Sequence, residues 1–166
     1  MLVYCDTNVY CRPLDDQSQP RIRAETEAFL DILERVERNE ITLVGSDILI
    51  AEVSRISSVP KRSLVELYLA HCTRHIPANI QIAQIADELV KHAQIKPKDA
   101  LHIASACCGH VRYFLTCDDR VTSKSKLVSK LTKRLGFGVT VLNPLDFLPL
   151  VNAEAQNEKG AQNATV

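Results

Sequence analysis

Short apolar runs alternate along the chain with longer stretches whose apolar residues recur at the helical period. The short runs cover residues 2–5, 41–44, 113–116 and 139–142. Each is too short for a stable helix and contains β-branched or aromatic residues, so we predict four strands there. The stretches 22–36 and 82–93 each keep one apolar face, which predicts amphipathic helices. Strands that alternate with helices predict an α/β fold with a central, mostly parallel sheet covered on both faces.

Residues that start or stop helices lie between these elements. Asn79 is suited to cap the helix that follows it, and Pro60, Pro77, Pro97 and Gly109 lie where helices should begin or end. The last stretch, residues 152–166, is rich in Ala, Asn, Gln and Glu and has no apolar period. We therefore expect one domain over residues 1–151 and a disordered tail over 152–166.

Composition narrows the class of protein. Apolar residues make up 46% of the 166 residues, enough for a compact core, and the 20 basic and 20 acidic residues give zero net charge. A chain that is strongly basic throughout is excluded, although a local basic face is not. The N-terminus lacks the features of a signal peptide, and no apolar run is long enough to cross a membrane.

The six cysteines do not form a metal-binding pattern. They lie at positions 5, 11, 72, 107, 108 and 117, without a CxxC pair. A structural zinc site needs four converging ligands, which paired spacing usually announces, so none is predicted. We expect reduced thiols in a cytoplasmic protein.

Acidic residues lie where an α/β protein binds its ligands, close to the carboxyl ends of the strands. Asp6 ends the first strand, Asp118 and Asp119 follow the strand at 113–116, and Asp99 opens an apolar helix at 100–108. Each has an ordinary alternative. Asp6 could cap a helix or a turn, Asp99 could favour a helix dipole, and Asp119 could point outward in a solvated turn.

Glu52 lies in the middle of an apolar stripe. A helix is expected from Ser46 to about Ser57, and at about 100° per residue Ile48, Glu52 and Ile56 lie within about 80° of one another. A buried carboxylate must be paired, neutral or bound to a cation. The alternative to a cation is an ion pair with a core arginine, Arg55 or Arg74. His102, on the helix that Asp99 opens, could support a metal ligand or be a satisfied core histidine, and the structural role is favoured.

Asp6, Glu52, Asp99 and Asp118 together are expected at one edge of the sheet. Oxygen ligands without His or Cys suit Mg²⁺ or Mn²⁺, as one ion or two. Such ions assist hydrolysis at phosphorus, and the sequence contains no GxSxG, Walker or GxGxxG motif that would supply other chemistry. The residues therefore predict metal-assisted hydrolysis of phosphodiesters.

Four segments resemble the acidic motifs of the PIN-domain ribonucleases. They are Asp6-Thr7-Asn8-Val9, the helix position of Glu52, the run from Lys98 to Ala104, and the run from Leu115 to Arg120. The ending Asn143-Pro144-Leu145-Asp146-Phe147-Leu148 is also similar, and the match spans about residues 1–150.

The resemblance implies a three-layer fold and a Mg²⁺- or Mn²⁺-dependent endoribonuclease, most often the toxin of a VapBC-like toxin–antitoxin pair. It implies that Asp6, Glu52, Asp99 and Asp118 hold the metal, that Asn8 and Thr116 are polar helpers, and that Asp119 assists. It also implies an RNA substrate, an antitoxin partner and a homodimer. The polar segment 11–23 matches no motif and could shape the rim of the cleft or contact a partner.

A basic segment follows the last acidic motif. Its side chains could follow an RNA backbone or form an ordinary solvated helix face; proximity to Asp118 favours RNA binding. Leu127, Val128, Leu131 and Leu135 should form its buried side. The basic residues are Arg120, Lys124, Lys126, Lys130, Lys133 and Arg134.

Two other functions are kept as alternatives. Asp6 at the end of the first strand partly resembles the nucleophile of haloacid-dehalogenase-type phosphatases, but Asn8 stands where that family needs an acid. The other alternative is a subunit that binds RNA or a partner without cutting. Four clustered carboxylates with no cation would cost such a subunit stability, which argues against it.

Overall fold

A single parallel sheet forms the centre of the protein in the computed structural model, which describes the backbone of residues 1–163 and the side chains of residues 1–154. The strands are β1 (Leu2–Cys5), β2 (Thr42–Ser46), β3 (Cys72–Ile76), β4 (Tyr113–Leu115) and β5 (Thr140–Leu142). They lie in the order β3-β2-β1-β4-β5, and every neighbouring pair is parallel. The α/β prediction is confirmed.

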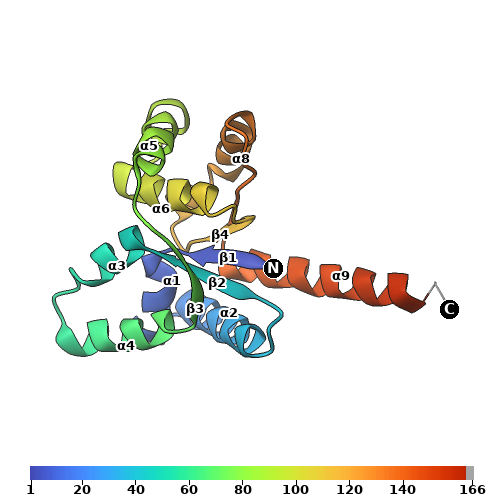
Figure 1. Cartoon of the computed structure of the whole chain (residues 1–166). Coiled ribbons are helices and arrows are strands. Elements are labelled where there is room, and N and C mark those ends of the chain that lie inside the picture. The colour runs from blue at the N-terminus through green and yellow to red at the C-terminus, as the bar shows by residue number, and fades with distance from the viewer. Residues whose placement is uncertain (164–166) are drawn as a thin grey trace.

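Helices cover both faces of the sheet. The helical elements are α1 (Thr7–Cys11), the 3₁₀ turn η1 (Arg12–Leu14), α2 (Pro20–Glu37), α3 (Asp47–Val53), α4 (Val59–Leu69), α5 (Ile80–Ala93), α6 (Pro97–Cys108), α7 (Asp119–Thr122), α8 (Ser125–Arg134) and α9 (Pro144–Asn163). Figure 1 shows α5, α6 and α8 on one side of the sheet and α1, α2 and α4 on the other. None of the helices in the described part of the chain has the length and apolarity to cross a membrane.

The predicted strands agree with the observed ones to within two residues at each end, but β3 was not predicted. β3 is an edge strand whose three central residues, Thr73, Arg74 and His75, are exposed. It therefore has neither the continuous apolar run of a buried strand nor the alternation of a half-buried one. Its pairing with β2 places it in the sheet.

Local sequence explains where several helices begin. The Ser46 hydroxyl accepts a hydrogen bond from the Leu49 amide, and the Asn79 side chain accepts one from the Ile82 amide, so both residues cap the helices that follow. Pro60 and Pro97 occupy first-turn positions of α4 and α6, where the missing amide proton costs nothing. Helix α3 ends at Val53, earlier than the predicted Ser57.

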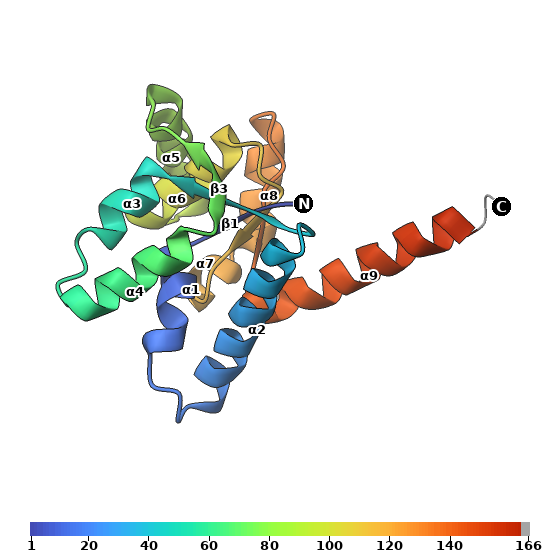
Figure 2. The same ribbon diagram turned by 60° about the horizontal axis from the view of Figure 1, so that its bottom comes forward.

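Helix α9 extends into the segment for which a tail is predicted. The backbone is helical from Pro144 to Asn163, whereas we expected an irregular chain from residue 152. Ala, Gln and Glu favour helices intrinsically, so the composition that gives no apolar period does not oppose a helix. Figure 2 shows α9 leaving the body of the protein beyond its contact with α2. Residues 164–166 lie outside the described residues, and the domain boundary at residue 151 stays a prediction.

A buried carboxylate joins α2 to distant parts of the chain. Glu25 is fully buried, and its oxygens lie 2.7 Å from Arg12 Nε and 3.0 Å from Arg21 Nε. The Asn143 amide, at the end of β5, donates to the same carboxylate at 2.7 Å. Much of the segment 11–23 is thereby fixed against the body of the protein.

We predict that Glu25→Ala lowers the free energy of unfolding by about 3 kcal/mol, because it leaves the mostly buried Arg12 and Asn143 without their partner. Urea denaturation followed by circular dichroism measures the change. Glu34→Ala is the matched control, since Glu34 pairs with Arg38 on the exposed face of the same helix and should change stability by less than about 1 kcal/mol. Equal losses in the two variants would contradict the role given to Glu25.

Candidate active site

The candidate site lies where the order of the strands reverses. β1 is followed on one side by β2 and on the other by β4, so the connections leave the sheet in opposite directions at the β1–β4 pair. Ligands of open α/β sheets bind in the crevice beyond the carboxyl ends of such strands. Asp6 comes directly after β1, and Thr116 to Asp118 follow β4.

Asp6 is held from two sides. Its side chain is buried, and its Oδ2 accepts hydrogen bonds from Asn8 Nδ2 at 2.6 Å and from the Thr116 hydroxyl at 2.9 Å. Asn8 Oδ1 in turn accepts from the Cys117 amide, which ties the Asn8 side chain to the end of β4. Burial raises the pKa of Asp6, and the negative charges of Glu52 and Asp99 add to the rise. Asn8 and Thr116 thus both lie on Asp6, where the resemblance placed polar helpers.

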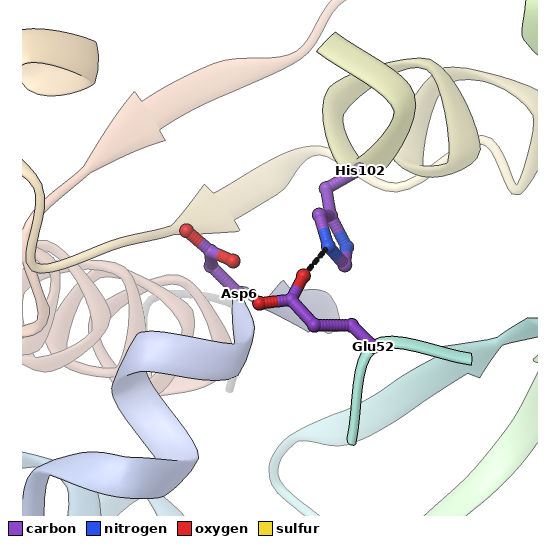
Figure 3. Close-up of side chains that lie close together, drawn as sticks. All are labelled: Asp6, Glu52 and His102. Atoms are coloured by element: carbon purple, nitrogen blue, oxygen red, sulfur yellow. Dashed lines mark hydrogen bonds and ion pairs between the residues drawn. The ribbon is translucent and has the colours of Figure 1, made fainter. Parts of the chain in front are cut away.

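Glu52 reaches the same point from α3. One oxygen each from Asp6 and Glu52 and a ring nitrogen of His102 all lie within 4.8 Å of one another, and Figure 3 shows the two carboxylates turned toward each other. Glu52 Oε2 lies 2.6 Å from His102 Nε2, and its Oε1 lies 2.6 Å from Lys98 Nζ. Burial favours a raised pKa, but these two hydrogen bonds outweigh it and lower the pKa of Glu52 to about 2. Glu52 is therefore ionised and paired with Lys98 and His102, rather than with Arg55 or Arg74.

His102 is part of a buried chain of hydrogen bonds. Its Nδ1 lies 2.9 Å from the Tyr4 hydroxyl, which lies 2.7 Å from the Ser46 hydroxyl. The Leu49 amide already donates to Ser46. The network is complete with a neutral imidazole when the Ser46 hydroxyl donates to Tyr4, the Tyr4 hydroxyl donates to His102 Nδ1, and His102 Nε2–H donates to Glu52. Both ring nitrogens are then used, so His102 orients Glu52 and is not counted as a metal ligand.

Asp99 and Asp118 lie next to this pair, outside its tight cluster. Burial raises the pKa of Asp99, and the charge of Asp118 raises it further. Asp118 is bonded to Arg120, whose Nη2 lies 2.6 Å from its Oδ2, and these hydrogen bonds lower the pKa of Asp118. Asp119 points away from the carboxylates and pairs with Arg21, which donates from Nη1 at 2.7 Å.

The donor set fits a hard divalent cation. Oδ1 of Asp6 accepts no hydrogen bond from the described residues, and Asp99 has no hydrogen-bond or ion-pair partner among them. Two half-buried or buried carboxylates thus have free oxygens beside Glu52 and Asp118. Mg²⁺ and Mn²⁺ prefer such oxygen ligands. Assignment of the four carboxylates as metal ligands stays a prediction.

The basic segment follows Asp118 in the chain and covers α7, the turn after it and α8. Lys126, Lys130, Lys133 and Arg134 are exposed on or near the outer face of α8, and Val128 and Leu131 are buried beneath them. Leu127 was expected on the buried side but is 44% exposed. Two other predicted RNA contacts have partners within the chain, since Arg120 bonds Asp118 and Lys124 donates to the backbone carbonyl of Gln94.

Sequence reasoning missed three basic side chains near the site. Lys98 was noted only within its motif, although it neutralises Glu52. Arg21 bridges the buried Glu25 and the exposed Asp119. The charge of Lys96 lowers the pKa of Asp118. Only the pair of Arg21 and Glu25, four residues apart on α2, has a spacing that the sequence shows. The other contacts join residues far apart in the sequence.

A family model described as PIN domain matches residues 3–127, which contain all four carboxylates. The chain belongs to the PIN-domain family. No curated protein matches the sequence, so the site of this PIN domain is assigned from its own geometry.

Two solved structures share the fold of this PIN domain at low sequence identity. VapBC2 from Rickettsia felis, bound to a DNA fragment from its promoter, is 17% identical with a TM-score of 0.58 and covers 86% of this chain and 98% of its own. FitAcB from Neisseria gonorrhoeae is 23% identical with a TM-score of 0.52 and covers 86% of this chain and 97% of its own. The similarity extends over nearly the whole length of both solved structures.

We predict that Asp6→Asn raises the melting temperature in metal-free buffer by about 2–4 °C, the shift that about 1 kcal/mol produces in a domain of this size. Because burial raises the pKa of Asp6, its ionised form costs stability at neutral pH, and an amide removes that charge while its oxygen can still accept from Asn8 and Thr116. Differential scanning calorimetry with and without saturating Mg²⁺ measures the effect.

The gain should disappear in Mg²⁺, which would stabilise only the unsubstituted protein. Asp87→Asn, on the exposed face of α5, is the matched control and should leave the melting temperature unchanged. A lower melting temperature for Asp6→Asn in metal-free buffer would show that repulsion at Asp6 is not what limits stability.

Proposed function

We propose that this PIN domain is a Mg²⁺- or Mn²⁺-dependent endoribonuclease. The observation that carries the proposal is the convergence of Asp6 and Glu52 at the β1–β4 crevice, with an oxygen of Asp6 left free and Asp99 unpaired beside it. An ionised carboxylate that is buried or half-buried and has a free oxygen is costly, and a bound cation offsets that cost. RNA is the substrate implied by the resemblance to PIN-domain ribonucleases, and the exposed basic face of α8 supports a polyanionic substrate.

Asp6, Glu52, Asp99 and Asp118 would hold the metal, as one ion or two. When bound, Mg²⁺ or Mn²⁺ supplies a Lewis acid that neutralises charge on the phosphate and makes a water molecule more acidic. Asn8 and Thr116 fix the position of Asp6, and His102 fixes that of Glu52. Lys98 and Arg120, both largely exposed, place positive charge at the mouth of the site, where a phosphate would approach.

We predict that purified protein cleaves a mixed-sequence single-stranded RNA in Mg²⁺ or Mn²⁺ and not in chelator. Asp99→Asn should lower the rate by at least about 100-fold, because it removes an ionised oxygen ligand from the acidic cluster. A gel-based cleavage assay on end-labelled RNA measures both effects.

Asp119→Asn is the matched control, since Asp119 pairs with Arg21 away from the cluster, and it should keep most of the activity. Cleavage that persists in chelator, or an Asp99→Asn variant with the normal rate, would overturn the proposal. Hydrolysis of a small phosphate ester in place of RNA would favour the phosphatase, and folded protein without any hydrolysis would favour a binding subunit.

We further propose that the protein is a cytoplasmic VapC-like toxin with an antitoxin partner. Both solved structures named above share its fold, and one of them is VapBC2 bound to a DNA fragment from its promoter. An antitoxin could block the site by placing an arginine on the carboxylates, because a guanidinium bonds carboxylates with two donors at once. The homodimer implied by the resemblance is part of this proposal.

Expression of the chain alone should slow bacterial growth, and expression of Asp6→Asn at the same level should not. Growth curves after induction, with immunoblots to match the protein levels, measure the difference. Slow growth with both the unsubstituted protein and Asp6→Asn would show that toxicity does not depend on the acidic site. Normal growth with a protein that cleaves RNA in vitro would count against the toxin role.

A further inference from the structure

A cavity with a basic rim opens beside the acidic cluster. It measures about 290 Å³ and lies between the loop that precedes α6 and the helix α7 with the turn after it. Asp99 forms part of its wall, so the cavity borders the candidate metal site. The other lining residues are Gln94, Ile95, Lys96, Arg120, Val121, Ser123 and Lys124.

The positive charges of this rim are not all used within the protein. Arg120 is bonded to Asp118. Lys96 and Lys124, in contrast, pair with no carboxylate of the described residues, and Lys124 donates only to the neutral backbone carbonyl of Gln94. The two lysines therefore leave a net positive charge around a cavity large enough for a phosphate group.

A second basic trough lies along α8, the helix that follows Lys124 in the chain. It measures about 460 Å³, is lined by Lys126, Lys130 and Lys133 together with Ser125, Ser129 and Thr140, and begins one residue beyond Lys124. The three lysines recur at the spacing that places side chains on one helix face. Two basic hollows are present, and the first is bordered by Asp99. Their positive charges suit the regularly spaced phosphates of a nucleic-acid strand better than an isolated anion.

We propose, on the basis of the nuclease function proposed above, that this side of the protein is a track for one arm of the RNA substrate. Lys96 and Lys124 bind the backbone phosphate next to the scissile one, and Lys126, Lys130 and Lys133 bind phosphates further along the same strand. The contacts are to phosphates, so they strengthen binding equally for all sequences. The substrate thus has to extend by several nucleotides on the α8 side of the cut.

Binding of a fluorescein-labelled single-stranded RNA, followed by anisotropy over a range of KCl concentrations, tests the track. The assay uses the full-length Asp6→Asn protein, which should bind RNA without cutting it. Lys96→Gln and Lys124→Gln should each reduce the slope of log K against log salt by about 0.7, the value for one phosphate contact on a single strand. Lys96→Arg and Lys124→Arg should keep the slope, because they keep the charge.

Arg38→Gln is the matched control, since Arg38 lies at the end of α2, before β2 and so at the opposite edge of the sheet. It should not change the slope. Unchanged slopes for both Lys→Gln variants would overturn the track, and if the unsubstituted protein still cuts RNA, the nuclease proposal stands. Failure of the unsubstituted protein to cut RNA would instead overturn the nuclease function itself.

Discussion

Repulsion between carboxylates at one edge of the sheet is the constraint on which the arrangement of the site depends. The structure meets it differently for each acid. Asp6 is buried and receives two hydrogen bonds. Glu52 is neutralised by Lys98 and hydrogen-bonded to His102, and Asp118 is neutralised by Arg120. Asp99 has no such partner, and its pKa is raised. The residual strain is electrostatic, and a divalent cation is the group that relieves it best.

The pairing of most site carboxylates with basic groups also explains how a chain of zero net charge can suit the polyanionic substrate proposed above. Its charges are separated in space. Acids lie at the crevice, and lysines that pair with no carboxylate of the described residues lie before α6, after α7 and along α8. Local field, rather than overall charge, determines where a phosphate binds. Composition alone therefore says little about the partner of such a protein.

The sequence was sufficient for the fold class and for the elements with strong local signals. The capping residues Ser46 and Asn79 and the apolar runs of the inner strands are of this kind. β3 escaped prediction because an exposed edge strand needs no apolar pattern, and the pairing that defines it is with β2, far away in the sequence. The helical end of α9 has no apolar period, so no local pattern in the sequence predicts it.

The same distinction applies to the site. Glu52 could be found because a carboxylate inside an apolar stripe contradicts the local pattern. Its partners could not, since Lys98 and His102 contact it across 46 and 50 residues of chain and both have ordinary places in their own helix. The hydrogen bonds that link Ser46, Tyr4 and His102 likewise form only when three elements of the fold are in place.

The pairing of β1 with β4 has a consequence for synthesis of the protein. Asp6 accepts a hydrogen bond from Thr116, 110 residues later, so the crevice is assembled only after the first 116 of the 166 residues have left the ribosome. Contacts this distant in sequence form late and slowly. A nascent chain accordingly carries Asp6, Glu52 and Asp99 before it can form the crevice, which is completed only after β4 has emerged.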